Sequence, residues 1–154
     1  MIKLDLGCGL LKLPDYVGVD VSRNGGLVDV VADIQFLPFK TESVNYIRSS
    51  RVIQHVQDDH KAMREIFRVL KKNGFAQLTF ASWLNAVAYK LKNFNKKTNY
   101  NIFHYYTEHN LSTLWKQAGF SFCFMDKLQN KKLKVFWDYH LLCSKKGKKI
   151  TIIR

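Results

Sequence analysis

The residues best suited to chemistry form a short glycine turn next to an acid. Gly7-Cys8-Gly9 follows the apolar stretch Ile2–Leu6, which contains Asp5. Glycines at alternate positions let the backbone turn tightly and approach a ligand closely. Open α/β sheets bind nucleoside cofactors at the carboxyl ends of their strands, so this turn is a candidate cofactor loop. An ordinary strand-to-turn Gly-x-Gly is the alternative interpretation.

Two more acids follow the next two apolar stretches. Asp20 could accept hydrogen bonds from both hydroxyls of a ribose. Asp33 could accept one from the exocyclic amine of a purine, with Ile34 or Phe36 against the ring face. Either acid alone could be a turn or helix-capping aspartate. Three strand-end acids in series with one glycine turn favour a nucleoside site.

The strands that must position these residues are short apolar stretches bounded by turn residues. A short connection joins the last two, which favours an antiparallel hairpin. The predicted strands are Ile2–Leu6, Tyr16–Val19, Val28–Ala32, Val44–Ser49, Phe75–Phe80, Phe120–Met125 and Leu133–Cys143.

Helical spacing of apolar residues predicts two helices among these strands. The first begins at Asp58 or Asp59 and ends at Asn73-Gly74, where glycine tolerates a positive φ. The second spans Thr107–Ala118, with Thr107 as its cap and Gly119 as its stop. Strands that alternate with helices indicate an α/β fold with a mostly parallel sheet, and 154 residues suit a single domain over 1–154.

Three of these motifs resemble those of class I S-adenosylmethionine-dependent methyltransferases: Asp-Leu-Gly-Cys-Gly at 5–9, Gly-Val-Asp at 18–20 and Ala-Asp-Ile-x-x-Leu-Pro-Phe at 32–39. Residues 51–56, 65–74 and 104–120 extend the match to small members of the quinone-biosynthesis (type 11) group. The resemblance implies a Rossmann-like fold, S-adenosylmethionine as cofactor and methyl transfer to an unidentified acceptor.

The resemblance also assigns cofactor-binding positions. Gly7, Cys8 and Gly9 would cradle the methionine part, with Asp5 beneath the loop. The ribose and the adenine would contact Asp20, Val21, Asp33 and Ile34. The residues expected near the sulfonium and the acceptor are Ser49, Ser50 and Arg51.

The chain departs from the family pattern in its early helices. Leu11 stands where a third glycine is expected, and only Leu10–Tyr16 and Val21–Leu27 separate the first three strands. A crossover that contains a helix needs roughly ten or more residues. We therefore expect a minimal version of the fold that lacks the N-terminal helix and the first crossover helices.

Methyl transfer to a hydroxyl or amine needs a base, and His55, His104 and Tyr105 are the candidates. The alternatives are a packing role for His55 and an aromatic lid for His104 and Tyr105. No group of His, Cys and carboxylate residues has metal-ligand spacing. Ser49-Ser50-Arg51-Val52 lacks the Pro-Pro-aromatic run of base-amino methyltransferases, so that acceptor is disfavoured.

Charge and cysteine content bear on partners and location. Residues 1–84 hold 11 basic and 9 acidic residues, whereas 85–154 hold 14 and 3. That excess favours nucleic acid or an anionic small molecule, with solubility alone as the alternative interpretation. Lysines interleave with aromatics within 84–103, a predicted insertion or lid. A basic tail follows at 145–154. Three widely spaced cysteines fit no disulfide framework and favour a cytoplasmic location, and no apolar run is long enough to span a membrane.

The missing helices predict a homodimer. If the early strands are apolar on both faces, one face lacks a cover, and a two-fold contact is a common solution. Ile2, Leu4, Leu6, Val17, Val19, Val28 and Val30 are the residues expected there.

Two other classes stay open. A nicotinamide oxidoreductase would need Gly-x-Gly-x-x-Gly, but Lys12 occupies the last position. A non-catalytic binding module on a methyltransferase fold is the second. Cofactor titration distinguishes the three.

Overall fold

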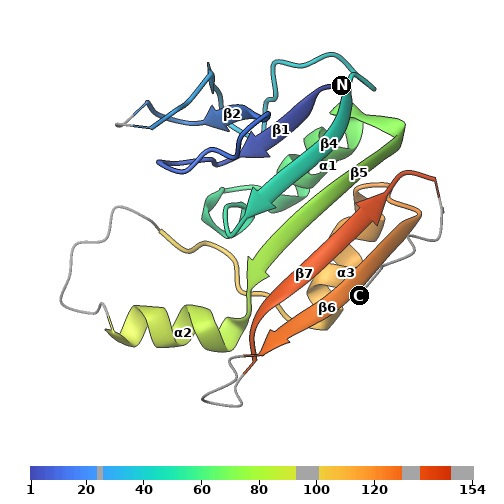
Figure 1. The fold of residues 1–154 in the computed structure, drawn as a ribbon. Coiled ribbons are helices and arrows are strands. Elements are labelled where there is room, and N and C mark those ends of the chain that lie inside the picture. The colour runs from blue at the N-terminus through green and yellow to red at the C-terminus, as the bar shows by residue number, and fades with distance from the viewer. Residues whose placement is uncertain (24–25, 93–100, 130–135, 147–154) are drawn as a thin grey trace.

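A seven-stranded sheet organises the computed structural model, which describes residues 1–23, 26–92, 101–129 and 136–146 (Figure 1). The strand order is β3-β2-β1-β4-β5-β7-β6. Strands β1 to β5 are parallel to one another, and β7 is antiparallel to both β5 and β6. This confirms the predicted mostly parallel sheet with an antiparallel hairpin at one end. The strands are β1 Lys3–Leu6, β2 Val17–Asp20, β3 Val30–Val31, β4 Val44–Ser50, β5 Leu70–Ala81, β6 Phe122–Gln129 and β7 Phe136–Ser144.

Two helices cover one face of the sheet, as Figure 1 shows for α1 (Asp59–Val69) and α3 (Glu108–Gln117). Asp58 caps α1 by accepting a hydrogen bond from Lys61 N, and Thr107 caps α3 through a capping box with Asn110. Both predicted starts are therefore confirmed. The core lies between these helices and the sheet, and its fully buried side chains include Leu4, Leu6, Ile47, Met63, Ile66, Leu78, Phe80 and Leu111.

The end of α1 differs from the prediction. The helix ends at Val69, and β5 begins at Leu70, so Asn73-Gly74 lies inside a strand. Gly74 is required for a different reason, because a Cβ there would lie 2.8 Å from the carbonyl oxygen of Asn45 on the neighbouring strand. The glycine thus permits close approach of β4 and β5 rather than a positive φ.

No helix occurs among the described residues between β1 and β4, which confirms the predicted absence of the first crossover helices. Hydrogen bonds hold the connecting loops instead. Asp29 accepts bonds from Lys12 Nζ at 2.9 Å and from Gly18 N at 2.7 Å. Gly7 N donates to the Val19 carbonyl at 2.7 Å, which ties the glycine loop to β2.

The residues that face away from the helices are not those expected. Leu4, Leu6 and Val19 are fully buried in the core between the sheet and the helices, so the prediction that they form an exposed apolar face is wrong. Side chains alternate along a strand, so Lys3 and Asp5 lie on the opposite face. The alternation of polar and apolar residues in β1 is typical of a sheet covered on one side.

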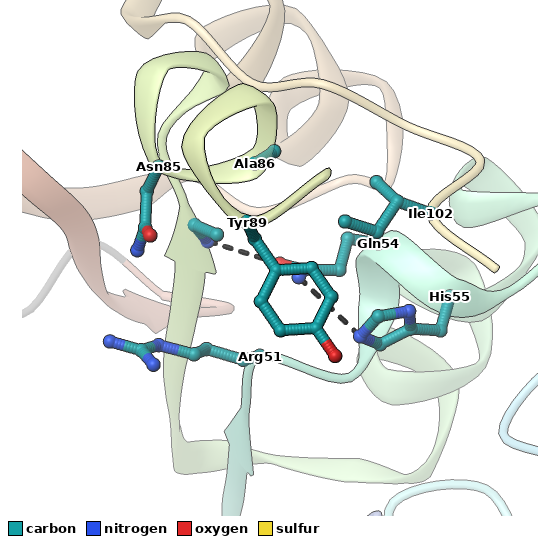
Figure 2. Close-up of a pocket in the computed structure, with 8 residues that line it drawn as sticks. Arg51, Gln54, His55, Asn85, Ala86, Tyr89 and Ile102 are labelled. Atoms are coloured by element: carbon teal, nitrogen blue, oxygen red, sulfur yellow. Dashed lines mark hydrogen bonds between the residues drawn. The ribbon is translucent and has the colours of Figure 1, made fainter. Parts of the chain in front are cut away.

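A third helix, α2 (Trp83–Lys92), lies beyond the carboxyl end of β5 and carries Asn85, Ala86 and Tyr89 (Figures 1 and 2). All of α2 except Trp83 falls in the segment 84–103, which the sequence predicts to be an insertion or lid. Residues 93–100 of that segment and 147–154 of the predicted basic tail lie outside the described residues.

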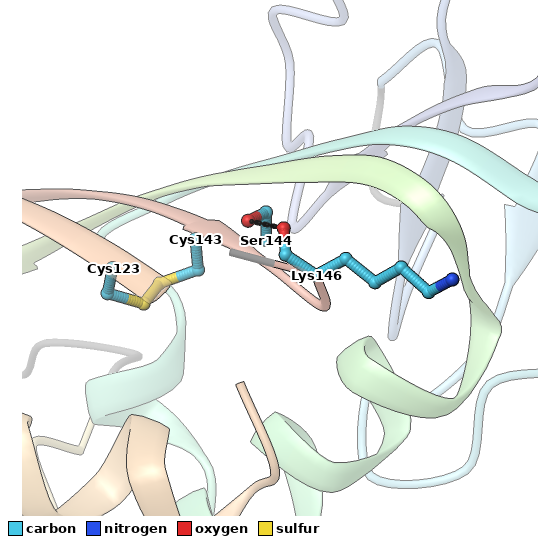
Figure 3. Close-up of a disulfide and its surroundings, with 4 residues drawn as sticks. All are labelled: Cys123, Cys143, Ser144 and Lys146. Atoms are coloured by element: carbon cyan, nitrogen blue, oxygen red, sulfur yellow. Dashed lines mark hydrogen bonds between the residues drawn. A yellow bond between two sulfur atoms is a disulfide. The ribbon is translucent and has the colours of Figure 1, made fainter. Parts of the chain in front are cut away.

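Two cysteines that the sequence left unpaired form a disulfide. Cys123 and Cys143 are opposite each other on β6 and β7, and their sulfurs are bonded (Figure 3). The expectation that the cysteines fit no disulfide is therefore wrong. Their sequence separation of 20 gives no sign of a pair, but the hairpin register brings their Cα atoms to 4.1 Å. The free cysteine is Cys8, which is buried.

Candidate functional site

A cavity of about 660 Å³ lies at the carboxyl ends of the parallel strands; we call it the cofactor cavity. Residues from the glycine loop, the ends of β2 and β4, and the segments after β3 and around η1 (Ile53–His55) contribute to its wall. The lining comprises Gly7, Gly9, Leu10, Asp20, Val21, Ser22, Gly26, Asp33, Ile34, Ser50, Arg51, Val52, His55, Val56, Asn101 and Phe103.

The two loop glycines have different structural roles. Gly7 has a φ of 68°, and a Cβ there would lie 2.2 Å from Cγ2 of Val52, so it is required both for its conformation and for packing. Gly9 has a φ of 52°, but no atom lies within 4 Å of the Cβ position. Open space beside a cavity-lining glycine is what close approach of a ligand to the backbone requires.

Asp20 and Asp33 both reach the cofactor cavity, as predicted from their strand-end positions. The Asp20 carboxylate accepts hydrogen bonds from Gly9 N at 3.0 Å and Ser22 N at 3.4 Å. Asp33 accepts bonds from Gln35 N and Gln35 Nε2, the closest at 2.8 Å. Each carboxylate oxygen can accept more than one hydrogen bond, so both acids are oriented by the chain and can still bind a ligand.

Asp5 lies outside the cavity lining, although the resemblance places it under the loop. Its carboxylate is 1 % exposed and accepts hydrogen bonds from Arg48 Nη1 at 3.0 Å and from Leu13 N at 3.2 Å. It therefore joins β1 to β4 and to the loop before β2.

Cys8 and Ser49 are also outside the lining. Burial raises the pKa of the Cys8 thiol, and the nearby Asp20 and Asp5 raise it further. A neutral buried thiol is a poor nucleophile, so the side chain of Cys8 is not a candidate nucleophile. The Ser49 hydroxyl is buried without a hydrogen-bond partner.

Arg51 forms a strained corner at the end of β4. Its φ is 58°, which is rare for a residue with a side chain, and its N–H donates to the Thr79 carbonyl at 2.9 Å. Its guanidinium is paired with the buried carboxylate of Asp138 on β7. Backbone strain of this kind occurs where a fold fixes a functional loop.

A second, smaller cavity of about 170 Å³ adjoins the first; we call it the α2 cavity. Arg51 and His55 line both cavities and so form their common boundary. Figure 2 shows α2 above this space, with Tyr89 pointing towards Arg51 and His55. The lining comprises Arg51, Gln54, His55, Ala81, Asn85, Ala86, Tyr89 and Ile102.

Of the three proposed bases, the cavities include only His55. Its Nδ1 lies 2.7 Å from the carbonyl oxygen of Asn101. A carbonyl oxygen can only accept, so Nδ1 carries the proton of the neutral ring and Nε2 is the acceptor. The side-chain Nε2 of Gln54 contacts His55 Nε2 at 3.4 Å, while its Oε1 accepts a bond from Ala81 N at 3.1 Å.

His104 and Tyr105 line neither cavity. His104 Nε2 lies 2.9 Å from the Val56 carbonyl, and its Nδ1 lies 3.5 Å from Asp59, which also accepts a hydrogen bond from Tyr106. Burial raises the pKa of the Tyr106 hydroxyl, so it remains a donor. Tyr105 lies beside Lys90, whose Nζ is 5.2 Å from its ring centroid. These contacts indicate a structural role for His104, and Tyr105 lies outside the lining of both cavities.

Sequence reasoning missed several lining residues. Val52 and Gln54 lie in the 51–56 segment but were not assigned to the site, Phe103 has no motif of its own, and Asn85 and Tyr89 lie on a helix whose place depends on tertiary contacts. The available signal for Gln54 was its position in the 51–56 motif, where a glutamate is common. Among the described residues, no group of three or more His, Cys, Asp or Glu could hold a metal ion.

Comparison with known proteins supports the cofactor assignment. Residues 4–78 match the family model described as a methyltransferase domain. The ubiquinone/menaquinone biosynthesis C-methyltransferase UbiE of Pectobacterium carotovorum is 35% identical over 78 residues, which is 48% of this chain and 30% of that protein. UbiE of Rickettsia prowazekii is 30% identical over 103 residues, 66% of this chain and 40% of that protein. The chain thus matches less than half the length of these relatives.

Solved structures share the fold at low sequence identity. A SAM-dependent methyltransferase from Thermotoga maritima is 20% identical with a TM-score of 0.72, covering 94% of this chain and 82% of that one. A Haloferax volcanii protein in complex with the Trm112 methyltransferase activator is 15% identical with a TM-score of 0.74, covering 97% and 83%.

The sheet order and the strand-end cavity define a Rossmann-like, cofactor-binding class of protein. Together with the match of residues 4–78 to the methyltransferase-domain family model, they support a class I S-adenosylmethionine-dependent methyltransferase of the type 11 group. The residues present fit that cofactor. Gly9 leaves space at the loop, and Asp20 and Asp33 present acceptors for hydroxyl and amine donors.

Proposed function

We propose that the chain binds S-adenosylmethionine in the cofactor cavity and transfers its methyl group to an acceptor. One observation carries the proposal: Gly9, Asp20 and Asp33 converge on a single cavity of about 660 Å³ at the carboxyl ends of the parallel strands. This is where open α/β sheets bind nucleoside ligands.

The cofactor supplies an electrophilic methyl group on a sulfonium, so the chain's contribution is position and electrostatics. Gly7 and Gly9 would hold the methionine part through the backbone, Asp20 would hold the ribose, and Asp33 with Ile34 would hold the adenine. Val21, Ser50 and Arg51 line the same cavity and complete its wall.

His55 is the proposed general base. Nδ1 is fixed by the Asn101 carbonyl, and the ring lies at the boundary between the two cavities. Nε2 would take the proton of a methyl acceptor that enters from the α2 side and replaces its 3.4 Å contact with Gln54 Nε2. We do not assign this role to His104 or Tyr105, because neither lines a cavity.

Calorimetric titration with S-adenosylmethionine and its demethylated product tests the proposal. Asp20→Ala should weaken binding about 10- to 100-fold, because a hydrogen bond to a charged group contributes about 1.5–3 kcal/mol. Asp126→Ala is the matched control, since Asp126 is an exposed acid on β6 outside both linings. Unchanged binding by Asp20→Ala would refute the ribose assignment.

Titration with NAD separates the other classes. Binding of NAD but not of S-adenosylmethionine would indicate an oxidoreductase, and binding of neither would indicate a module without this chemistry. The missing third glycine does not favour either outcome over methyl transfer. The glycine loop at Gly7 and Gly9 lines the cofactor cavity and lies within the residues that match the methyltransferase-domain family model.

A homodimer remains our proposal for the sheet face opposite α1 and α3. Cross-strand neighbours Tyr46, Phe75, Leu142 and Phe124 lie on that face, and among the described residues no helix covers it. Partly exposed aromatic side chains there suit a two-fold contact. Light scattering should give twice the chain mass at micromolar concentration, and a monomer mass independent of dilution would refute it.

Nucleic-acid binding remains a prediction from composition. Lys96 and Lys97, which were expected to contact phosphates, lie outside the described residues. The cysteine argument for the cytoplasm is withdrawn, because Cys123 and Cys143 form a disulfide. No described helix has the length and apolar character needed to cross a membrane.

A further inference from the structure

The outward face of α2 is apolar from the first residue of the helix to Leu91. Its five residues recur at helical spacing, and the four large ones are between 39% and 72% exposed. The helix lies beyond the carboxyl end of β5, away from α1 and α3 (Figure 1). We call this surface the α2 apolar face; it comprises Trp83, Leu84, Val87, Ala88 and Leu91.

The opposite side of α2 is the side that faces the rest of the chain. Ala86 is 3% exposed, and Asn85 and Tyr89 line the α2 cavity (Figure 2). These three residues lie between the members of the α2 apolar face in sequence and on the other side of the helix in space. The division into an inward and an outward face is therefore complete over more than two turns.

Hydrogen bonds at the start of α2 fix this orientation. The N–H of Trp83 donates to the Tyr106 carbonyl at 3.0 Å, and the N–H of Asn85 donates to Oγ of the buried Ser82 at 3.2 Å. Asn85 Nδ2 donates to the buried carboxylate of Asp138 at 3.1 Å. Turning the apolar face inward would break these bonds, so it stays on the surface. A contiguous exposed apolar surface of this kind marks an interaction site.

The charge of the chain around the α2 apolar face has one sign. Residues 66–107 contain seven Lys and Arg and no Asp or Glu. Lys90 is exposed and lies at the margin of the face, seven residues after Trp83. An apolar helix face bordered by cations complements a lipid bilayer with anionic headgroups, because such a bilayer presents negative charge above an apolar layer.

Two other occupants match these features less well. In a two-fold contact between α2 helices of two copies, like charges would come together, and residues 66–107 supply no acid to compensate them. Single-stranded nucleic acid binds by stacking on aromatic rings, whereas four of the five residues of the α2 apolar face are aliphatic.

We propose that α2 docks the chain on an anionic lipid bilayer. Trp83, Leu84, Val87 and Leu91 enter the interface, and Lys90 contacts the headgroup phosphates. The helix lies in the plane of the interface, since its 10 residues span about 15 Å and the hydrocarbon core is about 30 Å thick. Docking does not depend on the proposed function, because the α2 apolar face is not part of the lining of the cofactor cavity.

Vesicle sedimentation tests the class of partner. The full chain, without cofactor, is mixed with vesicles of phosphatidylcholine alone or of phosphatidylcholine and phosphatidylglycerol in equal amounts. Binding to the anionic vesicles should be about tenfold tighter or more and should weaken as the salt concentration rises. No binding to the anionic vesicles, or equal binding to both kinds, would overturn the proposal.

A pair of leucine substitutions locates the binding on α2. Leu84→Gln/Leu91→Gln should weaken vesicle binding about tenfold, and glutamine has nearly the helix propensity of leucine, so the helix is retained. Leu11→Gln/Leu27→Gln is the matched control, because these leucines are 84% and 66% exposed and lie in the loops before β2 and β3. An equal loss in both double variants would overturn the location. Thermal unfolding verifies that both are folded.

Two single variants test the contacts separately. Lys90→Gln should weaken binding to the anionic vesicles about threefold and leave binding to the neutral vesicles unchanged. Anionic vesicles should shift the tryptophan emission of the wild type to shorter wavelength, whereas Trp83→Phe should bind and lose most of that shift. An equal shift in Trp83→Phe would show that α2 does not enter the bilayer and would overturn the proposal.

Light scattering without vesicles distinguishes a lipid surface from a second copy. Leu84→Gln/Leu91→Gln should have the same mass as the wild type, because the α2 apolar face is assigned to lipid. A wild-type dimer that this variant converts to a monomer would assign the face to a second copy and overturn the proposal. The cofactor titration is a separate measurement, so failure of docking and failure of the proposed function are distinguishable.

Discussion

Removal of the Arg48 side chain should destabilise the fold far more than its partial exposure suggests. Arg48 is 32% exposed, but its partner Asp5 is 1% exposed. Arg48→Gln would leave Asp5 with only the Leu13 N–H as a donor. Loss of one partner from a buried ion pair costs about 3–5 kcal/mol, because a buried charge stays uncompensated. Since Arg48 is partly solvated, we expect about 3 kcal/mol.

Denaturant unfolding at neutral pH measures this loss, with Lys12→Gln as the control. Lys12 pairs with Asp29 at 2.9 Å, but Asp29 is 44% exposed, so this variant should lose about 1 kcal/mol or less. The double variant Asp5→Asn/Arg48→Gln should recover much of the loss, because no buried charge remains. A loss below 1 kcal/mol for Arg48→Gln would refute the reasoning from burial.

Three further outcomes follow from local geometry. Gly9→Ala should lower stability by about 1–2 kcal/mol, because alanine is strained in the left-handed backbone, and it should weaken binding of the cofactor product. Gly7→Ala should be less stable still, because its Cβ meets the stiff Val52 side chain. Thermal unfolding and calorimetric titration compare the two variants. Thr107→Ala removes the capping box of α3 and should cost about 1 kcal/mol by denaturant unfolding. Hydrogen bonds from Arg68 hold the pKa of Glu65 below its ordinary value. The stabilisation by Glu65 is therefore complete above the ordinary pKa of a glutamate and is lost as the pH falls through the lower folded pKa. By denaturant unfolding, the wild type should lose more stability over that range than Glu65→Gln, and equal losses would contradict the assignment.

Local signals predicted the caps and turns correctly where the interaction is local. Asp58 and Thr107 each accept a hydrogen bond from an N–H three residues ahead. The same reasoning was wrong at Gly74, because its role is set by Asn45 on the neighbouring strand. A glycine pattern alone does not distinguish a helix stop from close strand contact.

The candidate site likewise contains residues whose position follows from local sequence and residues whose position depends on tertiary contacts. Gly9, Asp20 and Asp33 reach the cofactor cavity because each lies at or within three residues of the carboxyl end of a parallel strand, and parallel strands end at one edge of a sheet. Asp5 is also an aspartate, but strand alternation turns its side chain to the face where Arg48 pairs with it.

By itself, the sequence determined where strands occur along the chain and which residues end them, because strand periodicity and turn chemistry act over a few neighbours. Only the tertiary structure decided which side chains meet across the chain. The Cys123–Cys143 disulfide depends on hairpin register, and the Arg51–Asp138 pair joins strands 87 residues apart. The placement of Tyr89 over His55 depends on how α2 packs at the end of the sheet (Figure 2). Such contacts arise from packing between distant segments, for which no local pattern in the sequence codes.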